Sequence, residues 1–237
     1  MTSYLLECRG IAYKIGTDVL LKDIDFSLSP GQGVLIFSKS QQTASSFLQI
    51  CSTLVRPAEG KLFIEGKEVN YANQGELLDL KRRLAFVDKK STLIQNLSVL
   101  DNIALSSIYH ENKSLEAIQI QLDPIIEMFG LREVLHLRPA ELDPAAKGRA
   151  LYAIEAVKEP VLAIFDQPEN NFNENDRYCL FNILHKLKED RDCGFIICTR
   201  SRSLMEKWGD ALFVLKDGLI SSPVDKHSFL LSWNQTL

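Results

Sequence analysis

The chain has 237 residues, of which 46% are hydrophobic and 24% charged, and its formal net charge is −4. This apolar content with so little net charge excludes intrinsic disorder, and the weakly acidic balance argues against nucleic-acid binding, which favours a basic face. No apolar run reaches the roughly 18 residues of a membrane span, and the N-terminus lacks the apolar stretch of a signal peptide. The length suits one large domain or a domain with an inserted subdomain.

The cysteines are scattered, with no CxxC pair and no His at metal-ligand spacing. Metal centres and disulfide frameworks need closer or paired spacings, so we expect no metal site and a reducing, cytoplasmic compartment. We expect the thiols to be buried as small apolar side chains. The five residues are Cys8, Cys51, Cys179, Cys193 and Cys198.

The first part of the chain predicts an antiparallel pair of strands followed by half of a βαβ unit. Residues 4–8 and 19–28 alternate apolar and polar side chains, as half-buried strands do. After a Pro-Gly turn, the apolar run 33–37 is typical of a buried strand. A polar loop at 38–42 and a helix at 43–55 follow it. Two more strands are expected at 62–67 and 84–87.

The second part predicts a block of helices and then alternating strands and helices. The helices are expected at 98–108, 114–130, 145–157, 174–189 and 201–208. The strands are expected at 161–166, 194–199 and 211–215, and the tail has little pattern. Interleaved buried strands and helices predict an α/β fold with a parallel sheet.

These landmarks, from residue 4 to about 220, resemble the ATP-binding subunits of ABC transporters. The resemblance rests on "VLLKDIDFSLSPGQGVLIFS", "RPAEGKLFIEGKEV", "RRLAFVDKKSTLIQNLSVLDNI" and "RPAELDPAAKGRALYAIEAVKEPVLAIFDQP", whose order and spacing agree with that family. It implies an ABC ATPase fold, in which a P-loop NTPase-like parallel-sheet core carries an N-terminal antiparallel β layer and an inserted helical subdomain. We expect the α/β core at 1–91 and 151–220, the helical subdomain at 92–150 and a C-terminal tail at 221–237.

Among subfamilies, the segment around the Q-loop and the "HLRPAEL" run look most like the ATPase of bacterial Mla/MCE-type phospholipid transporters. Lipoprotein-release and cell-division ATPases of the same superfamily are close competitors.

The resemblance places a phosphate loop at residues 37–45, but the residues that the loop needs are missing. Glycines let backbone N–H groups approach the phosphates, a lysine reaches the β and γ oxygens, and a Ser or Thr holds Mg²⁺. The family glycines fall at Phe37, Ser40 and Gln42, the lysine at Thr43 and the hydroxyl at Ala44. We therefore expect ATP and Mg²⁺ to bind weakly or not at all. The degenerate nucleotide site comprises Ile15, in place of an adenine-stacking aromatic, Lys39, Ser40, Gln41, Gln42, Thr43, Ala44, Ser45 and Asp166.

The catalytic positions have also changed. The family's catalytic glutamate falls at Gln167, and an amide cannot take a proton from water. The switch histidine falls at Arg200, which stays charged, and the Q-loop glutamine falls at Lys89. Asp166 survives at the magnesium-positioning place. Considered one at a time, these residues also have purely structural interpretations. Asp166 would be a strand-end cap, and Lys89 and Arg200 would be solvated surface charges.

The signature loop, which in the family faces the ATP of the other subunit, is replaced as well. Asp143 stands at the serine place, and Pro144 and Ala145 fill the glycine places. A carboxylate repels a phosphate, and proline removes a donor. The same Asp-Pro pair is a good N-cap and first residue for a helix without any phosphate.

Together these changes predict a catalytically inactive pseudo-ATPase that acts as scaffold or regulator. The resemblance implies a dimer with a second ABC ATPase subunit or with itself, docked on an integral-membrane permease at the inner face of the membrane. The alternatives are a functional ATPase that relies on Lys39, Ser45 and Gln167, and a soluble interaction module with the same fold. Leu93 and Ile94 precede a helix and have little reason to be apolar for the core, so we expect both to line a groove for a short permease helix.

Overall fold

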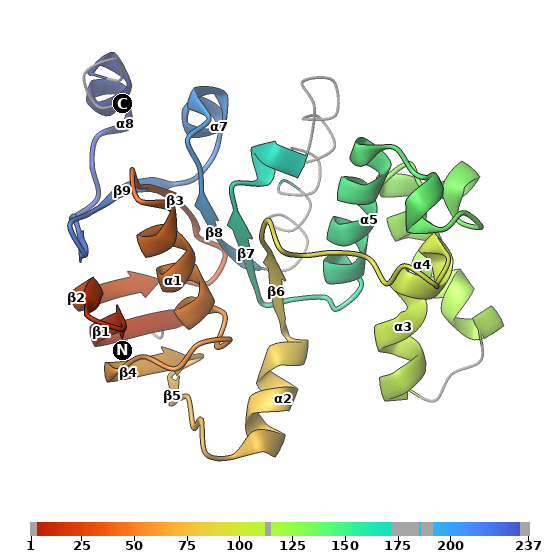
Figure 1. Cartoon of the computed structure of the whole chain (residues 1–237), viewed down its shortest axis with the longest axis horizontal. Helices are drawn as coiled ribbons and strands as arrows, with labels where there is room; N and C mark the ends of the chain where they lie inside the picture. The colour runs from red at the N-terminus through yellow and green to blue at the C-terminus, as the bar shows by residue number, and fades with distance from the viewer. Residues whose placement is uncertain (1–3, 112–114, 172–184, 186–191, 233–237) are drawn as a thin grey trace.

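The computed structural model describes residues 4–111, 115–171, 185 and 192–232. A four-stranded antiparallel sheet lies at one side of the molecule and a six-stranded, largely parallel sheet crosses its middle (Figure 1). The antiparallel sheet has the order β2-β1-β4-β5, with bounds β1 (Leu6–Ile15), β2 (Asp18–Leu28), β4 (Glu59–Ile64) and β5 (Lys67–Glu68). The expected N-terminal antiparallel layer is therefore confirmed.

Strand β1 continues well beyond the predicted segment 4–8. The pairing of β1 with β2 shifts register between Cys8 and Ile11, and Gly10 lies there with a φ of 60°. A bulge breaks the alternation of buried and exposed side chains, and the prediction stopped where that alternation was lost. The strand nevertheless pairs on to Ile15, opposite Asp18.

The second sheet has the order β10-β9-β3-β8-β7-β6. Its strands are β3 (Gly33–Phe37), β6 (Leu84–Val87), β7 (Leu162–Asp166), β8 (Gly194–Cys198), β9 (Ala211–Lys216) and β10 (Leu219–Ile220). All neighbours from β9 to β6 run parallel, and only β10 is antiparallel. Every residue of β3, β7 and β8 is buried, because helices or the other sheet cover both faces. The predicted parallel α/β core is therefore confirmed.

Helix α1 (Gln41–Cys51) fills the space between the two sheets. Its buried Phe47 meets the ring of Phe26 on β2 edge-on, with centroids 5.5 Å apart. One face of the parallel sheet packs with α1 and the antiparallel layer in a single core cluster, through Val34, Ile36, Ile164 and Ile196. The opposite face contributes to a second cluster with the other helices, through Leu35, Phe37, Phe165 and Ile197.

The middle of the chain forms the helices on the right of Figure 1. They are α3 (Val99–Glu111), α4 (Leu115–Met128) and α5 (Pro144–Ala156), with 3-10 turns η1 (Arg132–Val134) and η2 (Pro139–Glu141) between them. Each helix agrees with its predicted segment to within a few residues. The exact limits of the expected helical subdomain, 92 and 150, stay a prediction.

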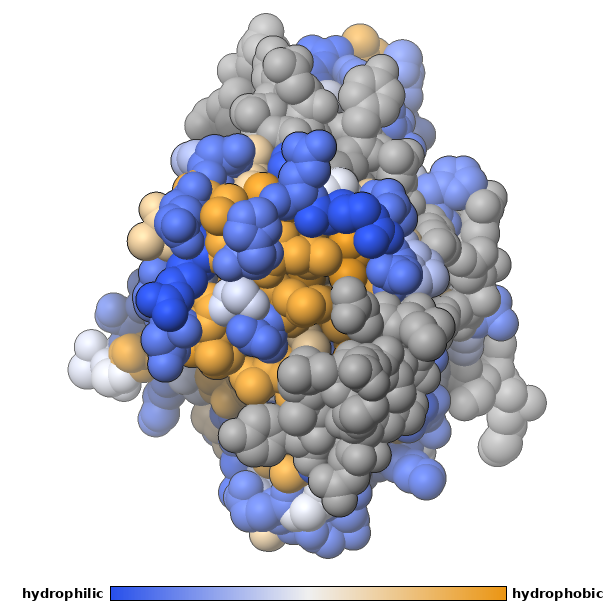
Figure 2. Space-filling model, turned by 90° about the vertical axis from the view of Figure 1, so that its right-hand side faces the viewer, coloured by the Kyte–Doolittle hydropathy of each residue, from blue (hydrophilic) through white to orange (hydrophobic). Residues whose placement is uncertain are grey.

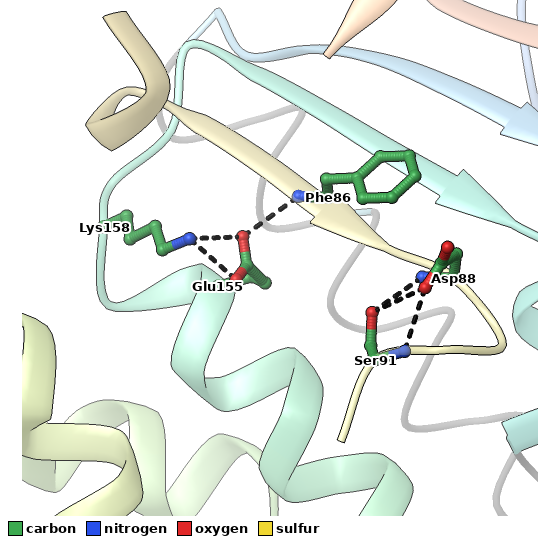
Figure 3. Close-up of polar contacts among 5 residues, drawn as sticks. All are labelled: Phe86, Asp88, Ser91, Glu155 and Lys158. Carbon is green, nitrogen blue, oxygen red and sulfur yellow. Dashed lines mark hydrogen bonds and ion pairs between the residues drawn. The ribbon is translucent and has the colours of Figure 1, made fainter. Parts of the chain in front are cut away.

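Helix α5 also closes the edge of the parallel sheet (Figure 3). The Phe86 N–H of edge strand β6 donates to Glu155 Oε2 at 3.0 Å, and Lys158 holds both oxygens of that carboxylate. Directly after β6, Asp88 Oδ1 accepts from the backbone N–H of Lys90 and Ser91, both at 2.9 Å. Ser91 Oγ donates to the same oxygen. The segment that carries Lys89 is thus fixed in a tight turn beside α5.

Two helices were not predicted. Helix α2 (Gln74–Arg82) buries only Leu77, so its apolar pattern is faint. Its start had a signal in the sequence, because Asn73 Oδ1 accepts from Glu76 N–H three residues on. Helix α8 (Lys226–Leu231) lies in the supposedly featureless tail, where Asp225 caps it and Phe229 packs on Phe37 at 5.3 Å between ring centroids.

The remaining sequence predictions have mixed outcomes. Helix α7 (Arg202–Lys207) lies where a helix was expected. Cys8, Cys51, Cys193 and Cys198 are buried free thiols, as predicted.

The predicted helix 174–189 lies outside the described residues except for residue 185, and Cys179 lies outside them as well. Within the described part of the chain, no helix combines the length and apolar character needed to cross a membrane.

Candidate functional site

Three loops meet at the carboxyl edge of the parallel sheet. They follow β3, β7 and β8, which are neighbours in the sheet with β8 in the middle. Ligands of open α/β folds bind at this edge, since the loops there converge on one place. The expected site residues at 37–45, Asp166 and Arg200 lie at the ends of these strands, in the loops after them or at the start of α1.

Asp166 ends β7 and is 3% exposed. Ser45 Oγ donates to its Oδ2 at 2.5 Å, and Gln41 Nε2 lies 3.3 Å from Oδ1 and 3.4 Å from Oδ2. Both donors stand on α1, so the expected proximity of Asp166 to the 37–45 segment is confirmed. The carboxylate is not a simple strand-end cap, because its partners are side chains more than 120 residues away in the sequence.

The surroundings of Asp166 favour its neutral form. Burial raises the pKa of this carboxyl above the ordinary aspartate value, and the carboxylate of Asp88, directly after the neighbouring strand β6, adds to the rise. The hydrogen bonds from Ser45 and Gln41, and the charge of Lys89, oppose the rise in pKa. The donors therefore compensate burial only in part.

The phosphate-loop segment uses its own hydroxyl groups to satisfy its backbone. Ser40 N–H donates to Ser38 Oγ at 3.2 Å, and Thr43 N–H donates to Ser40 Oγ at 3.2 Å. Ser40 is thereby the N-cap of α1. In a nucleotide-binding loop, such N–H groups point at the phosphate oxygens. Here two of them have partners within the loop.

Lys39 and Ser45, the expected substitutes for the missing phosphate-loop lysine and hydroxyl, lie in different surroundings. Lys39 is exposed, whereas Ser45 is committed to Asp166. Thr43 and Ala44, at the lysine and hydroxyl places, are buried. Phe37, at the first glycine place, is a core residue against Phe229.

Arg200 connects the loop after β8 to the phosphate-loop segment. Its Nε donates to Ser38 O at 3.1 Å, and its Nη2 donates to Lys39 O. The surface-charge interpretation is therefore wrong for Arg200, although the residue is exposed as a whole. Lys89 is also exposed, in agreement with a solvated charge.

Gln167 directs its side chain into its own loop. Its φ is 51°, in the left-handed region, and its backbone N–H donates to Cys198 O at 2.8 Å. Its amide oxygen accepts from Asn170 Nδ2 at 3.0 Å. A neutral amide in this arrangement supplies no base for water.

Glu169 was missed by the sequence analysis. Its Oε1 accepts from Thr199 Oγ1 at 2.8 Å and from Arg200 N–H at 2.9 Å. Glu169 follows Gln167 by two residues, but no periodicity or motif marked it, because its partners Thr199 and Arg200 are about 30 residues away in the loop after β8.

The residues expected at the signature and adenine positions lie at the start of α5 and at the end of β1. Asp143 Oδ1 accepts from Ala146 N–H at 2.7 Å, and Pro144 is the first residue of α5. The N-cap interpretation of this pair is confirmed. Ala145 follows in the first turn, and Ile15 ends β1 with its side chain half exposed.

The expectation that Leu93 faces outward is wrong. Leu93 is 4% exposed and belongs to the core cluster with Val99 and Ile103 of α3. Ile94 is 44% exposed, as expected. Asn102 fixes this turn, because its Oδ1 accepts from Ile94 N–H and its Nδ2 donates to Ile94 O. The turn directs one of the two neighbouring side chains inward and leaves the other at the surface.

Comparison with known proteins now adds to this geometry. The family model described as "ABC transporter" matches residues 21–170. The chain belongs to the ABC transporter family. It corresponds to the family's ATP-binding subunit. The lipoprotein-releasing system ATP-binding protein LolD of Aquifex aeolicus is 30% identical over 94% of this chain and 98% of its own. LolD of Idiomarina loihiensis is 28% identical over 93% and 98%.

Solved ABC cassettes share the fold. A dimeric ATP-binding cassette in a post-hydrolysis state, bound to ADP and Pi, has a TM-score of 0.85 at 23% identity, over 93% of this chain and 98% of its own. CbiO1 of Clostridium perfringens has a TM-score of 0.83 at 18% identity, over 97% and 91%. The predicted ABC ATPase fold is confirmed. Both sequence relatives are by name ATP-binding proteins of lipoprotein-releasing systems, one of the competing subfamilies. The Mla-type assignment stays a prediction.

The raised pKa of Asp166 predicts a pH-dependent stability. The folded state binds its proton more tightly than the unfolded chain, so stability falls as pH rises from about 3.9, the ordinary aspartate value, through the raised value. Asp166→Asn keeps a neutral side chain at every pH. We expect the wild type to lose stability relative to this variant across that window, measured by urea unfolding from pH 4 to 8.

Ser45→Ala provides the second arm of this experiment. It removes a donor that favours the charged carboxylate, so it should destabilise the protein more at pH 7 than at pH 4. A difference between wild type and Asp166→Asn that does not change with pH would contradict the account.

Proposed function

We propose that this ABC subunit is a pseudo-ATPase, which keeps the fold and the assembly role of its family without nucleotide chemistry. One observation carries the proposal: several groups that a magnesium nucleotide would use are already bonded within the protein. The Ser38 and Ser40 hydroxyls accept from the N–H groups of Ser40 and Thr43, and Ser45 and Gln41 donate to Asp166.

Binding a nucleotide would require several of these bonds to break. A neutral hydrogen bond contributes about 0.5–1.5 kcal/mol, and one to a charged group about 1.5–3 kcal/mol. The Arg200 bonds to the loop carbonyls would also be at risk. Position 43 has no lysine whose contact with the phosphates would offset these broken bonds, and Ala44 has no hydroxyl for Mg²⁺. ATP and Mg²⁺ are therefore bound weakly or not at all.

The atypical-ATPase alternative lacks support in the arrangement of the loop. It would rely on Lys39, Ser45 and Gln167. Lys39 is exposed, Ser45 is bonded to Asp166, and the Gln167 amide oxygen is bonded to Asn170. Ser45 and Gln167 would have to give up these bonds before they could act on a phosphate or on water.

The assembly part of the proposal is a cassette dimer, formed with a second ABC subunit or with a second copy. In the head-to-tail dimer that the family resemblance implies, each site combines one phosphate loop with the other subunit's signature. To one site this chain contributes Asp143, an N-cap carboxylate. To the other it contributes a phosphate loop whose N–H groups bond to hydroxyls of the same loop. Both sites are impaired, so the subunit serves as a scaffold or regulator. ATP is then hydrolysed slowly by the partner subunit or by another ATPase.

The second partner is an integral-membrane permease, which places this subunit at the inner face of the membrane. An apolar area framed by hydrophilic residues lies on the helical side of the molecule (Figure 2). The helices and turns of this part of the chain carry partly exposed apolar side chains at Leu100, Ile125, Met128, Val134, Leu135 and Leu137. Ile94, in the loop ahead of α3, is 44% exposed. Such an area supports docking of a membrane-protein helix. The names of the relatives support release of lipoproteins as the transport process, with phospholipids as the alternative cargo.

The nucleotide part predicts no ATPase activity above background for the purified protein. Calorimetry with Mg-ATP should give a dissociation constant weaker than about 0.1 mM, or roughly −5.5 kcal/mol. Gln167→Glu should restore no turnover, because the phosphate loop and the signature remain altered. Turnover that disappears in Asp166→Ala, or a micromolar dissociation constant, would refute the proposal.

The docking part predicts that Ile94→Asp releases the protein from membranes. Truncating an apolar anchor costs about 1–4 kcal/mol of binding, and a charge there costs at least as much. Leu78→Asp on α2 is the matched control, because Leu78 is 51% exposed and lies outside the docking area. Circular dichroism should show both variants folded. Membrane fractionation that retains Ile94→Asp as well as wild type would reject this docking site and favour the free interaction module.

A further inference from the structure

The loops after β3, β7 and β8 are joined by a continuous set of hydrogen bonds between protein groups. Glu169, after β7, accepts from Thr199 and from Arg200 N–H, which follow β8. The Arg200 side chain in turn donates to the carbonyls of Ser38 and Lys39, after β3. We propose that Arg200 is a positioning residue that links the three loops in place of a nucleotide, so that the protein reaches its working conformation with the site empty.

The chemistry of arginine suits this role. A guanidinium is planar, always charged and carries several N–H groups, so one side chain reaches two consecutive carbonyls. The arrangement reverses that of a phosphate loop. There the backbone N–H groups face an anion, whereas here two backbone oxygens face a cation. Arg200 thus stabilises a loop conformation in which these two backbone oxygens bind a cation.

Glu169 sets the position from which Arg200 reaches the loop. Its Oε1 binds the backbone of Arg200 and the hydroxyl of Thr199, which also accepts from Ser201 N–H at 2.9 Å. Ser201 is the N-cap of α7, so the hydrogen bonds continue into that helix. The backbone of the β8 loop is fixed on one side by Glu169, and the Arg200 side chain crosses to the phosphate-loop segment on the other.

This inference rests on the proposed absence of nucleotide binding and adds a consequence to it. If Arg200 already joins the loops, the phosphate-loop segment should be protected without nucleotide, and removing the guanidinium should expose it. A loop that depended on nucleotide would show the opposite pattern, with protection only when Mg-ATP is present.

The test is amide hydrogen exchange of the full chain, followed on peptides that cover 38–45 and 166–170. Arg200→Ala should speed exchange at 38–45 by about tenfold or more, since the two charge-assisted bonds to that segment are lost. Exchange at 166–170 should change less, because Glu169 binds the backbone N–H of Arg200, which the substitution keeps. Arg200→Lys should give an intermediate rate, because one ammonium group cannot span both carbonyls in a plane. If the alanine variant does not fold, the lysine variant decides.

Arg202→Ala is the matched control. Arg202 is an exposed arginine two residues on, and its Nε pairs with Glu206 in the same helix. Its loss should leave exchange in both segments within about twofold of wild type, as expected for a surface ion pair. Unchanged exchange in Arg200→Ala and Arg200→Lys, or an equal increase in Arg202→Ala, would overturn the role of Arg200.

A parallel arm with millimolar Mg-ATP separates this inference from the proposed function. Wild-type exchange at 38–45 should not change when Mg-ATP is added. Protection by Mg-ATP would overturn the pseudo-ATPase proposal, whereas the comparison of the Arg200 variants without nucleotide would still decide whether Arg200 links the loops.

Discussion

A carboxylate buried at the end of a central strand must find hydrogen-bond donors, and in this protein the donors of Asp166 come from α1. Ser45 and Gln41 lie on the first turns of this helix, within the phosphate-loop segment 37–45. Their bonds tie α1 to β7 across the interior. Ser40, directly before this helix, caps it through its hydroxyl. These contacts engage Asp166 and the N–H of Thr43, two groups that a magnesium nucleotide would use.

Several of the residues that stand in place of the family motifs stabilise the fold. Phe37 stands where a glycine is expected and packs its ring against Phe229 of α8. Burying such a side chain contributes about 1.5–3 kcal/mol. Asp143 and Pro144 begin α5 as an N-cap and first residue. The altered positions are therefore compatible with a stable subunit that is retained for its surfaces and its fold.

Much of the fold was predictable because it depends on local pattern. The apolar runs of β3, β7 and β8 marked a buried parallel sheet, and the order of landmarks marked the family. The failures had physical reasons. The turn fixed by Asn102 sends Leu93 into the core, and α8 buries too few residues to show a period. The residues of the site were predictable by position, but not their partners, since Gln41 and Asp166 are 125 residues apart. Glu169 carried no signal at all.

The most direct measurement of whether the site is closed by its own side chains is an NMR titration that follows the backbone amide signals of Ser40 and Thr43. These N–H groups donate to hydroxyls within the loop, and a bound phosphate would have to take them over. We predict that millimolar concentrations of magnesium and a non-hydrolysable ATP analogue leave both amide signals unchanged. Saturable shifts of both signals, of the kind produced by a phosphate accepting the two N–H groups, would contradict the account.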